Sequence, residues 1–154
     1  KSDILDFAKK FVKDITVGMG IEDVVLESQR TENYIKITMH SENSSLLIGK
    51  NGRTLSSLQT LLRAAISKEV SFKVNVVLDV ENYKEKKISN LERTAKRIAK
   101  EVQKTKMDVK MDSMNSFERR LVHEVLKDFK GIKTESEGEE PNRKVVIKPI
   151  EGKE

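Results

Sequence analysis

The sequence contains no cysteine and no tryptophan among its 154 residues. Without cysteine, disulfide bonds and thiolate zinc sites are excluded, and a reducing compartment is permitted. No apolar run approaches the roughly 20 residues of a membrane-spanning helix. No signal-peptide pattern opens the chain. We therefore expect a cytoplasmic location.

Proline and glycine are also scarce, with 2 and 7 residues. Periodic apolar segments with so few breakers argue against a disordered chain, and the length favours one or two small domains. Lysine and arginine number 30 against 25 aspartates and glutamates, which gives a net charge of +5. This excess favours a polyanionic partner, although a merely solvated basic surface would produce the same count.

The first half of the chain alternates between helical and strand periodicity. Apolar residues recur at helical spacing over residues 4–15, and glycines at 18 and 20 end that pattern. Two strands are expected at 24–29 and 34–39, and the second alternates as a half-buried antiparallel strand does. A short helix at 45–48, a Gly-Lys-Asn-Gly loop, a helix at 53–69 and a strand at 72–80 complete the order α-β-β-α-α-β.

The second half begins with a long, highly charged helix from about 81 to about 106. Outside its apolar stripe lie Arg93, Lys96, Arg97, Lys100 and Lys104. A short strand near 107–111, a helix at about 116–129 and a hairpin from 132–137 and 143–148 should follow. Asn115 and Glu118 form a plausible N-terminal cap pair for that helix. We predict an α+β fold of two small domains, residues 1–80 and 81–154, joined rigidly by the long helix.

Two glycines bracket the loop between the second and third expected helices. Gly49 and Gly52 let the backbone come very close to a ligand. The helix that starts at the loop favours an anion at its unpaired N–H groups, and Lys50 and Arg53 add full positive charges. The spacing excludes a P-loop. Taken alone, the motif also suits an ordinary helix–turn–helix corner.

The segment at 47–55, LIGKNGRTL, resembles the loop of a type II KH domain when it is set in this order of elements. The resemblance implies that the loop clamps a short single strand by its backbone beside an apolar groove. The residues expected to bind are Ile48, Gly49, Lys50, Asn51, Gly52 and Arg53. The groove should be floored by Ile48, Leu55 and Leu58 and edged by Ile35 and Ile37.

Arg119 and His123 are four residues apart, so they lie one above the other on a helix. They fall just outside the apolar half-circle of that helix with Lys127 and Lys130, and Arg120 is adjacent. A solvated charged face is the simpler interpretation of such a stripe. Metal binding is disfavoured because the other histidine, at position 40, lies in the first half and no carboxylate cluster accompanies position 123. No nucleophile and base form a catalytic set, so we expect neither an enzyme nor a cofactor.

The segment at 114–123, MNSFERRLVH, resembles the signature of the R-3-H domain, which is named for an arginine and a histidine and binds single-stranded nucleic acid. Together with the segments at 78–83, 136–141 and 143–147, it resembles the bacterial Jag (SpoIIIJ-associated) family, in which a KH domain precedes an R-3-H domain. The resemblance covers essentially the whole chain. It maps Arg119 and His123 onto the pair that names the domain. We expect these two residues, with Lys127 and Arg120, to contact a second stretch of the strand that the KH loop holds.

Family members are RNA-binding regulators linked to bacterial cell elongation and division, and they pair with a small KH-only protein. Many carry an N-terminal Jag domain that this sequence lacks, so we expect membrane contact only through such missing N-terminal parts. The resemblance favours a non-catalytic, single-stranded RNA-binding regulator. The alternative is a KH-mediated protein-interaction scaffold with incidental nucleic-acid binding. The choice between RNA and DNA stays open at this point, and the few aromatic residues limit base stacking.

Overall fold

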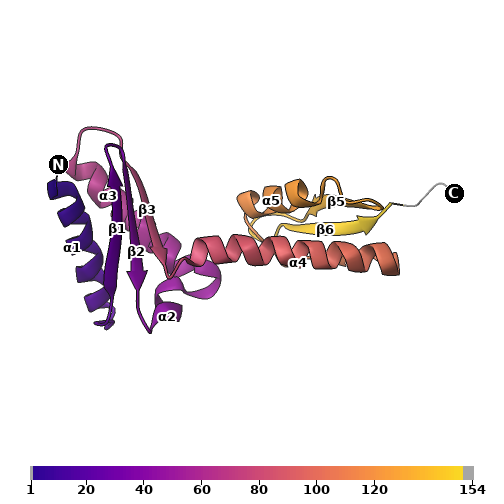
Figure 1. The fold of residues 1–154 in the computed structure, drawn as a ribbon, viewed down its shortest axis with the longest axis horizontal. Coiled ribbons are helices and arrows are strands. Elements are labelled where there is room, and N and C mark those ends of the chain that lie inside the picture. Colours follow the sequence, from indigo (N-terminus) through magenta and orange to yellow (C-terminus); the bar gives the residue numbers. More distant parts are fainter. Residues whose placement is uncertain (1, 151–154) are drawn as a thin grey trace. The chain divides into compact units, whose positions relative to one another are not determined.

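The computed structural model describes residues 2–150, with side chains from residue 4 onward. Contacts divide the chain between Lys84 and Glu85 into two compact units, each a mixture of helices and a small sheet (Figure 1). The predicted α+β fold class is confirmed. We propose that the two domains divide between residues 80 and 81.

Unit 1, which precedes Glu85, has the predicted order of elements. Its elements are α1 (Ser2–Gly18), β1 (Val25–Thr31), β2 (Tyr34–His40), α2 (Ser44–Ile48), a 3-10 turn (Lys50–Gly52), α3 (Arg53–Glu69) and β3 (Asn75–Val80). The Gly-Lys-Asn-Gly loop therefore lies between α2 and α3, as the periodicity predicts. These boundaries differ from the expected ones by a few residues at most.

The sheet of unit 1 has the strand order β1-β2-β3. β1 runs antiparallel to β2, and β3 runs parallel to β2 with Leu78 opposite Ile37. A parallel pair needs a long crossover connection, and α2, the loop and α3 supply it. The central strand and the helices bury one apolar cluster. Each fully buried leucine or isoleucine contributes about 1.5–3 kcal/mol to stability.

The start of α4 (Tyr83–Thr105) is fixed by a buried carboxylate. Asp79 is 2% exposed, and its Oδ1 accepts hydrogen bonds from the backbone N–H of Val80 at 2.9 Å and of Lys84 at 3.3 Å. Glu81 and Asn82 have left-handed backbone angles, with φ of 48° and 57°. The helix therefore begins two residues later than its expected start.

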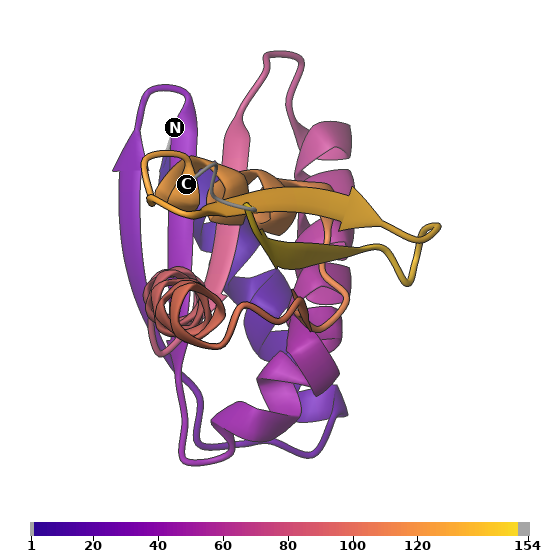
Figure 2. The same ribbon diagram turned by 90° about the vertical axis from the view of Figure 1, so that its right-hand side faces the viewer.

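Unit 2 contains most of α4, then β4 (Val109–Lys110), α5 (Ser116–Leu126), β5 (Ile132–Glu137) and β6 (Lys144–Pro149). The strand order is β4-β6-β5, with both pairs antiparallel. The hairpin of β5 and β6 is visible in Figure 2. The predicted cap is confirmed, because Asn115 Oδ1 accepts a hydrogen bond from the Glu118 N–H at 2.9 Å. Within residues 2–150, no helix combines the length and apolar character that a membrane span requires.

Candidate nucleic-acid interface

The loop between α2 and α3 requires glycine at both of its ends. Gly49 has φ of 73°, and a Cβ atom there would lie 2.1 Å from Thr54 Oγ1. Gly52 has φ of 78°, and its Cβ would lie 3.0 Å from Cε1 of Tyr83. A side chain at Gly49 would be strained in its backbone and would clash. Glycine at these two positions therefore lets the loop pack closely against Thr54 and Tyr83 and leaves its backbone without side chains there.

The loop carries exposed positive charge at the N-terminus of a long helix. Asn51 has a left-handed backbone with φ of 55°, and Arg53 is the first residue of α3. The N–H of Arg53 donates to the Lys50 carbonyl, and the N–H groups at the start of a helix carry partial positive charge. Lys50 and Arg53 are exposed and form no ion pair with any residue between 4 and 150. Together these features suit a phosphate group.

The prediction of an apolar groove beside the loop is wrong for four of its five residues. Ile35 and Ile37 are 0% exposed, and Leu55 and Leu58 are 2% and 8% exposed. All four belong to the core, because the apolar side chains of β2 and α3 pack into the same cluster. Ile48 is only partly buried and stays a candidate contact.

Leu46 on α2 is an apolar surface residue that the sequence reasoning missed, at 60% exposure. Its neighbour Leu47 is fully buried. Consecutive residues of a helix point in different directions. The run Leu46-Leu47-Ile48 could therefore have indicated that one of the three faces solvent near the loop.

Arg119 lies inside unit 2 and not on an open basic stripe, so this part of the expected surface is wrong. It is 8% exposed. Its Nη1 donates a hydrogen bond to the Met114 carbonyl at 2.7 Å, and its Nη2 donates to Glu140 Oε1 at 2.7 Å. A helical projection gives the direction of the side chain but cannot reveal that the hairpin turn brings Glu140 to it.

His123 lies half-buried against β5, which contributes two hydroxyl partners. Its Nδ1 lies 2.6 Å from Thr134 Oγ1, and its Nε2 lies 2.9 Å from Ser136 Oγ. Thr134 and Ser136 are two residues apart, so they share one face of the strand. Burial lowers the pKa of His123 below its ordinary value, and the nearby Arg119 charge lowers it further. The lowered pKa favours the neutral ring, in which one nitrogen donates and the other accepts.

Three side chains around this pair remain exposed. Arg120 and Lys127 face solvent, and Lys127 has a weak exposed ion pair with Glu124 at 3.3 Å. Phe117, in the first turn of α5, is 58% exposed although the sequence pattern groups it with the apolar face. An exposed aromatic ring next to positive charge can stack on a nucleic-acid base. In the sequence, the one indication that Phe117 is exposed is its position in the first turn of the helix.

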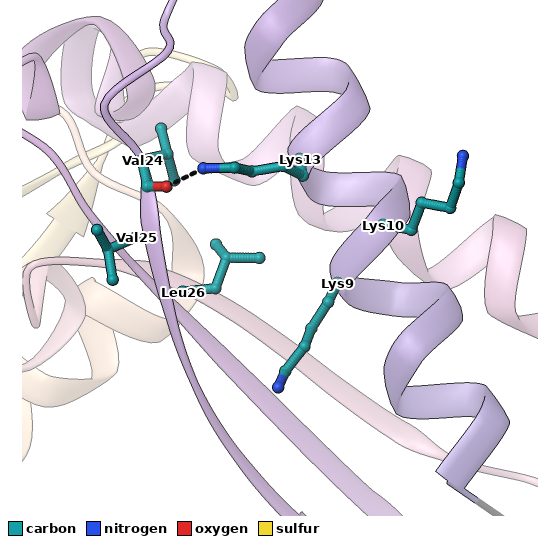
Figure 3. Close-up of a pocket in the computed structure, with 6 residues that line it drawn as sticks. All are labelled: Lys9, Lys10, Lys13, Val24, Val25 and Leu26. Atoms are coloured by element: carbon teal, nitrogen blue, oxygen red, sulfur yellow. Dashed lines mark hydrogen bonds between the residues drawn. The ribbon is translucent and has the colours of Figure 1, made fainter.

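The structure also has a hollow between α1 and β1, lined by Lys9, Lys10, Lys13, Val24, Val25 and Leu26 (Figure 3). Lys13 Nζ donates to the Val24 carbonyl, and Lys10 pairs with Asp14 at 2.9 Å. The hollow contains no residue of the loop or of α5. Among residues 4–150, no cluster of histidine, aspartate or glutamate could hold a metal ion.

A glycine-bracketed, positively charged loop on an α-β-β-α-α-β unit, followed by an arginine–histidine helix over a hairpin, defines a protein of two successive nucleic-acid-binding-type domains. The comparisons with known families agree with this class. The model described as KhpA/KhpB, KH domain, matches residues 3–78, and that of the R-3-H domain matches residues 89–149.

Several curated proteins named RNA-binding protein KhpB are similar to this chain. That of Clostridium symbiosum is 38% identical over 148 residues, which cover 96% of this chain and 67% of the relative. That of Bacillus subtilis is 38% identical over 151 residues, covering 96% and 71%. That of Lactiplantibacillus plantarum is 40% identical over 144 residues, covering 94% of this chain but only 43% of the relative. The chain belongs to the KhpB family, which is the Jag family that its sequence resembles.

Proposed function

We propose that the chain is a non-catalytic RNA-binding regulator that holds single-stranded RNA through its KH loop. The observation that carries this proposal is the loop at residues 49–52. It combines two glycines, the N-terminus of α3 and two exposed cations, Lys50 and Arg53, which form no ion pair within residues 4–150. The curated relatives at 38–40% identity are named as RNA-binding proteins, which favours RNA over DNA.

The loop binds phosphates rather than bases. Gly49 and Gly52 let the sugar–phosphate chain approach the backbone, where the N–H groups of the first turn of α3 donate hydrogen bonds. Lys50 and Arg53 add charge-assisted contacts, which are about twice as strong as neutral hydrogen bonds. Asn51 and Ile48 line the approach to the loop. Such contacts fix the strand in place without reading its sequence.

Unit 2 supplies a second contact around Arg119 and His123. Arg119 is 8% exposed and holds the Met114 carbonyl and Glu140, so it shapes the surface on which the exposed side chains lie. Arg120 and Lys127 contribute exposed charge, and Phe117 a stacking surface. Two weak contacts in one chain raise the overall affinity if a single strand reaches both.

The finer parts of the proposal depend on family membership. The chain acts in the control of bacterial cell elongation and division, and its KH unit pairs with a small KH-domain protein. In the scaffold alternative, such a protein contact would be the main function. Ionic strength separates the two, because phosphate binding weakens steeply with salt and an apolar protein interface hardly responds.

Fluorescence anisotropy with labelled single strands tests the proposal. We expect tighter binding to an unstructured RNA than to a DNA of matched sequence. On a single strand, each neutralised phosphate contributes about −0.7 to the slope of log K against log salt. On an RNA long enough for these two sites alone, if four cations each neutralise one phosphate, raising the salt from about 50 to about 200 mM weakens binding about fifty-fold. Absence of binding to either strand at the lower salt would favour the scaffold.

A further inference from the structure

Helix α4 exposes a continuous row of positive side chains. Arg93, Arg97, Lys100 and Lys104 follow one another at spacings of four, three and four residues, and all four are exposed. Residues at these spacings lie on the same side of a helix. Lys86, seven residues before Arg93 and also exposed, extends the row by two turns. We call these five residues the α4 ridge.

The ridge faces away from the core of unit 2. The buried residues of α4 are Ala95, Ile98, Ala99 and Val102. At about 100° per residue, the centre of this buried side lies about 180° from the centre of the ridge. The core that holds α4 in place therefore leaves the ridge open, and no side chain of the core has to move for a ligand to reach it.

The ridge is also unneutralised. Among the residues that the structure describes with side chains, 4–150, none of the five ridge residues forms an ion pair. Arg93 donates to Asn90 Oδ1, at 3.3 Å within the same helix. Some basic residues elsewhere in unit 2 do have acidic partners, such as Lys87 with Glu118 at 3.7 Å and Lys148 with Glu135 at 2.7 Å.

We propose that the α4 ridge is a further binding surface for the phosphate backbone of RNA. The inference rests on the proposed RNA binding of this chain and extends it to a surface outside the KH loop and the Arg119–His123 pair. From residue 86 to residue 104 the ridge spans about 27 Å, at 1.5 Å per residue. At about 3.4 Å per nucleotide, that length matches about eight nucleotides. The ridge lengthens the bound segment without reading its bases.

The composition of the ridge favours RNA over other anionic partners. A helix that lies on a membrane inserts an apolar face, but the apolar face of α4 is buried in the core. A protein interface usually has an apolar or aromatic centre. None of the exposed large apolar residues, which include Met107 and Phe117, lies in the ridge. The ridge offers charge alone, and that is what a phosphate backbone requires.

The test combines Arg93→Gln, Arg97→Gln, Lys100→Gln and Lys104→Gln in one variant. Glutamine is a good helix former, and none of the four side chains packs in the core, so the fold should be kept. The matched control removes four exposed lysines elsewhere, Lys10, Lys68, Lys73 and Lys110, also as glutamine. Binding of an unstructured RNA of about 30 nucleotides is measured at four salt concentrations.

We expect the ridge variant to bind at least tenfold more weakly near 100 mM salt, with a salt slope smaller by about 3 in magnitude. The control should change the slope by less than about 1. The ridge variant could instead show an unchanged salt slope while wild-type binding of RNA still depends on Lys50 and Arg53. That result would overturn the proposal for the ridge and leave the proposed function standing. No RNA binding by wild type would overturn the proposed function as well. Ridge-dependent binding to phosphatidylserine vesicles, without any effect on RNA, would assign the ridge to lipid and overturn this proposal.

Discussion

Reversing the two charges of the KH loop, Lys50→Glu with Arg53→Glu, should weaken binding of a short single-stranded RNA by at least a hundredfold. Each side chain would lose a charge-assisted contact worth about 1.5–3 kcal/mol and would repel the phosphate instead. Two such losses exceed the roughly 2.8 kcal/mol that a hundredfold change requires. The affinity is measured by fluorescence anisotropy with an RNA so short that it contacts the KH loop and no other site.

The charge-reversed protein should stay folded, which makes the result interpretable. Arg53 is the first residue of α3, where a negative side chain interacts favourably with the helix dipole. Aspartates at Gly49 and Gly52 would be a poorer choice, because a side chain at Gly49 clashes with Thr54. The control is Lys68→Glu with Lys73→Glu, which changes the net charge equally on another exposed surface. An equal loss of affinity in the control would mean that net charge, and not the loop, governs binding.

Removing the guanidinium of Arg119 should destabilise unit 2 by about 2–3 kcal/mol, because a buried, paired side chain is lost. Arg119→Ala would leave the Met114 carbonyl without its partner and open space beneath α5. Domains are stable by only about 5–15 kcal/mol, so this is a large fraction. Urea unfolding measures the change, and Arg119→Lys should recover little of it because lysine lacks the planar fork.

Two further measurements distinguish a structural role of Arg119 from a role as an exposed surface residue. Glu140→Gln removes only the exposed end of the ion pair, whose carboxylate side chain is 60% exposed, and should cost less than about 1 kcal/mol. In a folded Arg119→Gln protein the pKa of His123 should rise, because a nearby positive charge is gone, while burial still holds it below its ordinary value. Unchanged stability of Arg119→Ala and an unmoved His123 titration would place the arginine outside the packing of unit 2.

The order of elements could be predicted because each segment has one strong local signal. The glycines at 49 and 52 bound α3 at its start, and the Asn115 cap bounds α5. The alternation around a polar turn places β5 and β6 within one residue of their expected limits. These signals act over a few residues, so the sequence alone displays them.

Features that depend on distant partners could not be predicted. Alternation from Phe72 suggested an earlier start for β3, but Asn75 pairs with Tyr34, the first residue of β2, so the residues before it have no partner strand. Phe72 is accordingly 50% exposed. The burial of Arg119 depends on Glu140 in the hairpin turn. The hydroxyl partners of His123 likewise come from β5 and cannot be inferred from α5.

Backbone amide chemical shifts of the labelled protein, titrated with a short single-stranded RNA, test the central claim most directly. The account predicts that the first and largest shifts arise at residues 49–53 and in the first turn of α3. Smaller shifts should follow at residues 117–123 and along the α4 ridge as the RNA is lengthened. Saturable RNA binding that leaves the amides of residues 49–53 unmoved would contradict the account, because the KH loop would then not be the site that holds the strand.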